Sequence, residues 1–145
     1  MNNTFRINTF EAMKYSRLSA EQLTELEKEF VDFLVVNGIV AEDWIALKEN
    51  EPLNADKIID QFSDVVWEGT LRKLKYLNKI ETNVAYYFKC DAEEIHLIRV
   101  LGTGDNAELH NASKKYIKVR EEELFDMLQS GCEISKGREY ESLRQ

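Results

Sequence analysis

His96 is the side chain best suited to acid–base chemistry, because the pKa of an unperturbed imidazole lies near neutrality. It stands in a run of strand-forming residues from Glu94 to Leu101, which places Glu94 on the same strand face. A nucleophile would complete a hydrolase, but neither Cys90 nor Ser135 has the sequence setting of one. His96 is therefore a weak catalytic candidate for a small enzyme, and no other catalytic residue is predicted.

The residue types that bind zinc occur in the chain without a zinc-binding pattern. They are Cys90, His96, His110 and Cys132. Their spacing matches no zinc finger, so neither a metal nor a cofactor is predicted.

The cysteines lack C-x-x-C spacing, which favours reduced thiols over a single long-range disulfide. The sequence from Gly102 to Asp105 suggests a phosphate loop only superficially, because the Gly-Lys-Ser/Thr ending is missing, and a turn is the better interpretation.

Negative charge is concentrated in the first half of the chain. Residues 13–70 contain 13 acids and 5 bases, whereas residues 71–145 contain 13 of each, and the net charge of the whole chain is −8. An acidic surface disfavours a phosphate backbone, because nucleic-acid affinity rests on cations that displace counterions. The leading prediction is a non-enzymatic interaction or regulatory protein that presents an acidic helical surface to a basic protein partner.

Two basic clusters support a different function. The first is interleaved with Leu74, Tyr76 and Leu77 and comprises Arg72, Lys73, Lys75 and Lys79; the second comprises Lys114, Lys115, Lys118 and Arg120. Arg72, Lys73 and Lys75 are candidate binding residues of a nucleic-acid- or ribosome-associated factor that uses basic strand residues. Solvated strand and helix edges explain the same lysines more simply, so nucleic acid is not the favoured partner.

A third set of candidate binding residues surrounds a tryptophan. Glu68, beside Trp67, could be a recognition carboxylate at a helix end, and Asp64 lies one turn earlier on the same face. A structural interpretation is favoured over this one. In it Trp67 anchors the core and Gly69 ends the helix.

Helical signals fill the first half. Ser19 and Gln22 form a capping box, and apolar residues follow helical spacing from Leu23 to Leu34, before Asn37-Gly38. A short helix is expected over 41–48, and another, with Asn54 as its N-cap, through Trp67 to an end at Gly69.

Strand signals dominate from Leu71 onward. Strand formers are densest at 84–89 and 94–101, and the connections are too short for parallel crossovers, so an antiparallel meander is expected. Residues 102–113 are expected to be a polar connection, 116–119 a short strand, 121–130 a helix, and 132–140 a strand with a turn at Lys136-Gly137. The predicted fold class is α+β, with N-terminal helices packed on a small antiparallel sheet of three to five strands and a further C-terminal helix.

The length of 145 residues suits one domain, predicted over 13–145, with residues 1–12 as an extension that could be flexible. Because the helical signals begin just after Met13, translation could start there rather than at Met1. The sequence contains no apolar run long enough for a membrane span and no secretory signal, so a cytoplasmic location is expected; the oligomeric state stays open.

Several segments resemble an uncharacterised family of small bacterial proteins, a domain of unknown function. They are 13–19 (MKYSRLS), 62–69 (FSDVVWEG), 95–98 (IHLI) and 131–137 (GCEISKG). The resemblance spans roughly residues 13 to 140 and implies a single domain without an established activity. Some relatives bear a histidyl-tRNA synthetase label, which does not fit, because such an enzyme needs an ATP site and several hundred residues.

Overall fold

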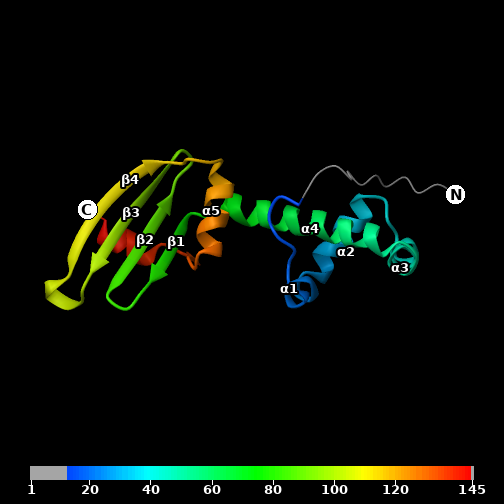
Figure 1. Cartoon of the computed structure of the whole chain (residues 1–145), viewed down its shortest axis with the longest axis horizontal. Helices are drawn as coiled ribbons and strands as arrows, with labels where there is room; N and C mark the ends of the chain where they lie inside the picture. Colours follow the sequence, from blue (N-terminus) through cyan, green and yellow to red (C-terminus); the bar gives the residue numbers. More distant parts are fainter. Residues whose placement is uncertain (1–12, 145) are drawn as a thin grey trace. The chain divides into compact units, whose positions relative to one another are not determined.

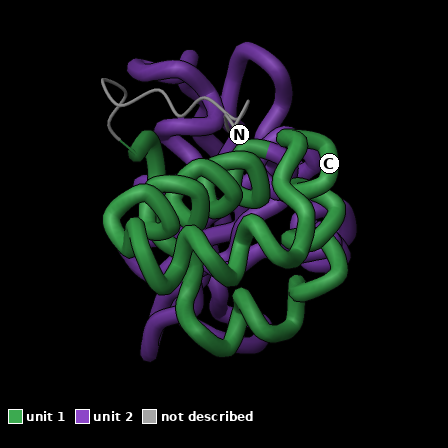
Figure 2. The backbone as a smooth tube through the Cα atoms, turned by 90° about the vertical axis from the view of Figure 1, so that its right-hand side faces the viewer, with its two compact units in different colours: residues 1–68 green, residues 69–145 purple. Residues whose placement is uncertain are grey.

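The computed structural model describes residues 13–144, which form two compact units: residues 13–68, the N-terminal unit, and residues 69–144, the C-terminal unit (Figure 2). The boundary falls inside one long helix, α4 (Pro52–Lys73). Whether residues 13–145 fold as one domain stays a prediction, and the expected extension at 1–12 lies outside the described residues.

The N-terminal unit is helical. Its elements are α1 (Ala20–Glu25), α2 (Glu27–Val36), α3 (Ala41–Asn50) and the first part of α4 (Figure 1). The predicted capping box is confirmed: the Ser19 hydroxyl accepts the Gln22 backbone N–H at 3.1 Å, and the Gln22 side chain accepts the Ser19 N–H at 2.9 Å. The apolar run that follows forms two helices rather than one, because the chain turns at Leu26 (φ −102°, ψ 24°).

Helix α4 is longer at both ends than the sequence predicted. It begins at Pro52, whose missing N–H costs nothing in a first turn, while Asn54 donates its side-chain amide to the Glu51 carboxylate at 2.7 Å. It also continues through Gly69 to Lys73. One glycine costs a helix only about 1 kcal/mol, which the complete burial of Leu71 outweighs.

The core of the N-terminal unit joins α2, α3 and α4. Its buried members are Leu34, Ile39, Leu47, Ala55 and Ile58, with Phe30, Phe33 and Trp44 packed against them. The Phe30 ring lies 5.2 Å from Trp44 and 5.0 Å from Phe62 between ring centroids, both in edge-on geometry. Edge-on aromatic pairs stabilise a core beyond the contribution of their buried area, which matters in a unit with few buried residues.

The C-terminal unit contains a five-stranded antiparallel sheet in the order β4-β3-β2-β1-β5 (Figure 1). Its strands are β1 (Tyr76–Ile80), β2 (Val84–Cys90), β3 (Glu94–Leu101), β4 (Glu108–Lys115) and β5 (Glu133–Ser135). A single 3-10 turn, η1 (Gly104–Asn106), precedes β4. The predicted α+β class and antiparallel meander are confirmed.

Two local predictions in this unit are wrong. The expected polar connection at 102–113 contains most of β4, all eight residues of which are exposed, so the strand has no apolar alternation for a sequence to show. The strand expected at 116–119 is absent: Ile117 is 87% exposed, and the segment leads into the next helix.

The end of the chain follows the prediction more closely. Helix α5 (Arg120–Gln129) is confirmed. The strand expected over 132–140 is confirmed only as β5, and its last residues, 138–140, begin α6 (Arg138–Leu143), which the sequence did not indicate. Gly137 has φ 86°, and a Cβ there would collide with the Tyr76 ring.

The buried residues of this unit include Leu71, Leu74, Leu77, Cys90, Ile95, Ile98, Leu124, Cys132 and Tyr140. Within residues 13–144, no helix has the length and apolarity that crossing a membrane requires.

Candidate functional site

The carboxylates predicted around Trp67 hold the chain segment that precedes α1. Asp64 accepts the backbone N–H groups of Lys14 at 2.7 Å and Tyr15 at 2.9 Å, and Glu68 accepts the Tyr15 hydroxyl at 2.6 Å. The Trp67 indole donates to the Ser16 carbonyl at 3.0 Å. These contacts give all three residues a structural role, while their predicted role in binding a partner stays a prediction.

Two acids nearer the start of α4 also bind the segment that precedes α1. The Arg17 guanidinium donates to Asp60 at 2.6 Å and lies 3.6 Å from Asp56, and the hydrogen bond to Asp60 raises the pKa of Arg17. The buried Ser63 hydroxyl accepts the Leu18 N–H at 3.1 Å. Acidic residues on α4 therefore fix the segment 14–18.

The acids of α1, α2 and α3 behave differently. All eight are exposed, and none of their side chains forms a hydrogen bond or ion pair with another described residue; they are Glu21, Glu25, Glu27, Glu29, Asp32, Glu42, Asp43 and Glu49. The same three helices carry only two bases, Lys28 and Lys48. We call this set of eight the unpaired acids.

Exposed apolar side chains lie among the unpaired acids. On α2, Val31, Val35 and Val36 are 49%, 63% and 84% exposed, and Ile45 on α3 is 52% exposed. Val31 and Val35 are one turn apart and extend the column begun by Glu27 along the border of the buried face, while Asp32 and the 84% exposed Val36 lie opposite the buried Leu34. Apolar area and negative charge thus share the outer side of α2.

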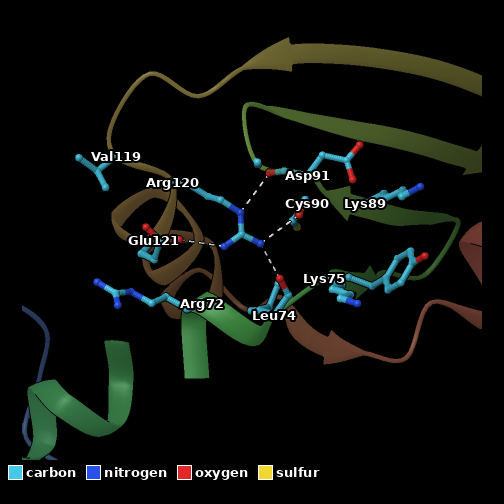
Figure 3. A pocket seen from close by; sticks show the side chains of 11 residues that line it. Arg72, Leu74, Lys75, Lys89, Cys90, Asp91, Val119, Arg120 and Glu121 are labelled. Carbon is cyan, nitrogen blue, oxygen red and sulfur yellow. Dashed lines mark hydrogen bonds and ion pairs between the residues drawn. The ribbon is translucent and has the colours of Figure 1, made fainter. Parts of the chain in front are cut away.

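The predicted basic residues Arg72 and Lys75 both line a pocket of the C-terminal unit, whereas Lys73 does not (Figure 3). Arg72 comes from the last turn of α4 and Lys75 from the α4–β1 connection, so the description of these residues as strand residues is wrong. The pocket has a volume of about 870 Å³. Its other lining residues are Leu74, Tyr76, Lys89, Cys90, Asp91, Ala92, Val119, Arg120 and Glu121.

Arg120 organises the wall of this pocket. Its guanidinium donates to the carbonyls of Leu71, Leu74, Cys90 and Asp91 and to the Glu121 carboxylate at 3.0 Å (Figure 3). One side chain therefore joins the end of α4, the end of β2 and the start of α5. The sequence placed Arg120 in a basic cluster but gave no sign of this role, because all four carbonyls come from distant segments.

The rest of the second basic cluster is largely neutralised within the chain. Lys114 pairs with Glu123, and Lys118 lies 2.6 Å from Asp126. Glu123 also accepts the backbone N–H of Ile117 at 2.6 Å and of Lys118 at 3.2 Å. Partial burial works against ionisation of Glu123, but these hydrogen bonds outweigh it and lower the pKa of the carboxyl.

His96 is joined to two side chains that the sequence did not connect with it. Its Nδ1 lies 2.6 Å from the Ser113 hydroxyl on β4, and its Nε2 lies 3.1 Å from the Asp91 carboxylate. Asp91 lines the pocket, whereas His96 and Ser113 do not. The order carboxylate, imidazole, hydroxyl is that of an activated serine. Ser113 lies on β4, a strand that the sequence did not indicate.

The cysteines offer little chemistry at neutral pH. Both Cys90 and Cys132 are free and buried, and burial raises the pKa of Cys90 to about 12 and also raises that of Cys132. A protonated thiol is a poor nucleophile. Among the described residues, no three His, Cys, Asp or Glu side chains gather where they could hold a metal ion.

No curated protein and no solved structure matches this chain. One family model does match, over residues 13–106 and 101–145, and together these segments cover all the described residues. The predicted bacterial origin stays a prediction. The match agrees with the resemblance seen in the sequence, and the chain belongs to this family, the family of unknown function DUF6495.

Proposed function

We propose that this protein is a non-enzymatic cytoplasmic interaction protein that binds a basic, amphipathic segment of a protein partner on the surface of α1, α2 and α3. The observation that supports the proposal most directly is the division of the acids in the N-terminal unit. Those on α4 hold the segment 14–18, while the unpaired acids have no partner among the described residues.

Helix stability explains part of this distribution. Five of the unpaired acids lie in the first turns of their helices, where the helix dipole stabilises a negative charge by about 0.3–1 kcal/mol each. The other three, Glu25, Asp32 and Glu49, lie in the middle or last turns. No side chain among the described residues pairs with them, and a basic partner would do so.

The apolar residues define the partner further. A cationic ligand alone would need no contact with Val31, Val35 and Ile45, whereas a helix with one basic and one apolar side would bury them and pair with the acids. Surface ion pairs contribute only about 0.2–1 kcal/mol each, so the apolar contact must supply much of the affinity.

A peptide of lysine and leucine with helical spacing is a suitable probe, with binding to the full chain measured by calorimetry at two salt concentrations. We expect saturable binding that weakens with salt. The triple variant Glu25→Gln, Asp32→Asn, Glu49→Gln should weaken binding about tenfold, from three lost pairs.

The matched control is Glu93→Gln, Asp105→Asn, Glu133→Gln, which changes the net charge equally through exposed acids of the C-terminal unit. It should bind the peptide almost as the unmodified chain does. Equal weakening by both triple variants would reduce the effect to net charge alone, and the proposal would be wrong.

Hydrolysis centred on His96 is a second candidate, favoured by the Asp91–His96–Ser113 chain. In it the Ser113 oxygen would attack an ester carbonyl as His96 accepts the hydroxyl proton, and Asp91 would orient the imidazole. The bond to the alcohol would then break, His96 would return the proton to the leaving alcohol, and water would release the acid from Ser113. An activated aryl ester tests this. Hydrolysis that Ser113→Ala does not reduce would leave these contacts as structural.

Binding of nucleic acid has less support, because Lys114, Lys118 and Arg120 are each ion-paired within the chain. A fluorescence titration with mixed RNA at two salt concentrations checks it. We expect no salt-sensitive binding.

A further inference from the structure

We propose that the pocket of the C-terminal unit binds a small organic oxyanion, a phosphate or carboxylate group attached to an apolar body. This site lies in a different unit from the acidic surface and does not rest on the function proposed for that surface. Some of the charges around the pocket are paired within the chain, and others are not.

Both acids that line the pocket are engaged by cationic or ionisable neighbours. Glu121 accepts from Arg120 at 3.0 Å, and Asp91 lies 3.1 Å from His96 Nε2. Arg120 in turn directs its N–H groups to four carbonyls and to Glu121, so it holds the wall together rather than presenting its charge to a ligand. Arg120 and Glu121 neutralise each other, and the other cations of the lining outnumber its other acid, Asp91.

Two lysines line the pocket from different chain segments, Lys75 and Lys89. Arg72 lines it too, but its guanidinium points away from both lysines (Figure 3), and it has a contact of its own within the chain. Lys89, at the end of β2, has only a long contact to Glu141, with 3.9 Å between nitrogen and oxygen. Lys75 is exposed, and its side chain forms no hydrogen bond or ion pair with any described residue. Two positive charges on the lining of one pocket repel each other, and an anion placed between them would relieve that repulsion.

The helix dipole does not explain Lys75. Arg72 and Lys73 lie in the last turn of α4, where the dipole favours a positive charge, but Lys75 lies beyond the helix end. Lys73 shares the exposure of Lys75 and its place in the basic run, yet does not line the pocket. These two lysines therefore form a matched pair for experiment.

The remaining lining residues set the character of the rest of the ligand. Leu74, Ala92, Val119 and the Tyr76 ring supply apolar contact, and Val119 is 58% exposed. A volume of about 870 Å³ lies within the range of roughly 300–1,000 Å³ typical of small-molecule sites. Because two carboxylates also line the walls, the pocket suits a single anionic group on an apolar body better than a polyanion.

The test is an NMR titration of the full-length protein, labelled with nitrogen-15, with phenyl phosphate, benzoate and neutral phenol. We expect saturable shifts at lining residues with at least one of the two anions and none with phenol; the tighter anion identifies the group. Lys75→Met should weaken that binding about tenfold, while Lys73→Met should leave it unchanged.

Lys89→Met provides a second, independent loss of a pocket cation and should also weaken binding. Two results would overturn the proposal. One is the absence of saturable shifts with either anion; the other is equal affinity in Lys75→Met and Lys73→Met, with thermal unfolding showing both variants folded. The unpaired acids are unchanged in every variant, so failure here is separate from failure of the protein-binding proposal.

Discussion

The two units use charge in opposite ways. In the N-terminal unit the core is aromatic and aliphatic, and many acids lie at the surface with no side-chain partner among the described residues. In the C-terminal unit acids and bases are equal in number, and several pair across segments, as Lys114 does with Glu123 and Arg120 with Glu121. Charges that hold a fold together are poor evidence for a binding site, whereas charges that no internal contact explains are better evidence.

The largest effect should follow from opening the aromatic core of the N-terminal unit. Phe62 is 2% exposed, and its ring lies 5.0 Å from Phe30 and 5.4 Å from Phe33 between centroids. Phe62→Ala should lower the free energy of unfolding by about 3–5 kcal/mol, measured by urea denaturation. Val36→Ala, at an 84% exposed position, is the control and should change it little. A cost below about 1 kcal/mol for Phe62→Ala would mean that this core is not closely packed.

The next largest effect is expected from removing the hydrogen bonds by which Arg120 joins segments of the C-terminal unit. Arg120→Met would leave the carbonyls of Leu71, Leu74, Cys90 and Asp91 without their donor, at an expected cost of about 3 kcal/mol. Arg138→Met, at an exposed position, is the control. A cost equal to that of the control would show that water replaces the guanidinium.

The same variant tests the single-domain prediction. Both tryptophans, Trp44 and Trp67, lie in the N-terminal unit, whereas the whole sheet lies in the C-terminal unit. If the chain is one domain, Arg120→Met lowers the transition seen by tryptophan fluorescence as much as that seen by circular dichroism. A fluorescence transition that does not move would mean two separately folding units.

The sequence predicted best those elements whose signals are local. The capping box at Ser19 and the strand-forming runs of β2 and β3 need only neighbouring residues. Strand β4 was missed because all its residues are exposed and its pairing with β3 defines it.

Site residues show the same limit. The spacing of Asp64 and Glu68 put them on one helix face, but their contacts with Lys14 and Tyr15, about fifty residues away, could not be read from it. Arg72 and Lys75 were identified as a basic run, while the separation of Lys75 from Lys73 depends on where α4 ends.

A smaller effect, with a defined pH dependence, is expected at Glu123. Glu123→Gln should cost about 1.5 kcal/mol at neutral pH, because charge-assisted hydrogen bonds from Lys114 and the Ile117 amide are weakened. Because the pKa of Glu123 is lowered in the folded chain, its contribution is complete above the unfolded pKa and is lost as the pH falls through the folded pKa.

The difference between Glu123→Gln and the unmodified chain should therefore shrink below about pH 4. Denaturation at several pH values measures it, with Glu122→Gln as the neighbouring control. A difference that is constant across this range would contradict the assigned role.

The smallest structural effect concerns the helix start that the sequence identified. Ser19→Ala removes the acceptor of the Gln22 N–H and should cost about 1 kcal/mol in the same urea assay. No measurable change would show that water satisfies this amide equally well.

The division of acids in the N-terminal unit is tested most directly by comparing the unfolding free energies of two variants. Asp60→Asn combined with Asp64→Asn removes charge from the contacts with Arg17, Lys14 and Tyr15, and should cost about 3 kcal/mol. The triple variant Glu25→Gln, Asp32→Asn, Glu49→Gln should stay within about 0.5 kcal/mol of the unmodified chain. A loss in the triple variant as large as in the double would contradict the account, because those acids would then be serving the fold.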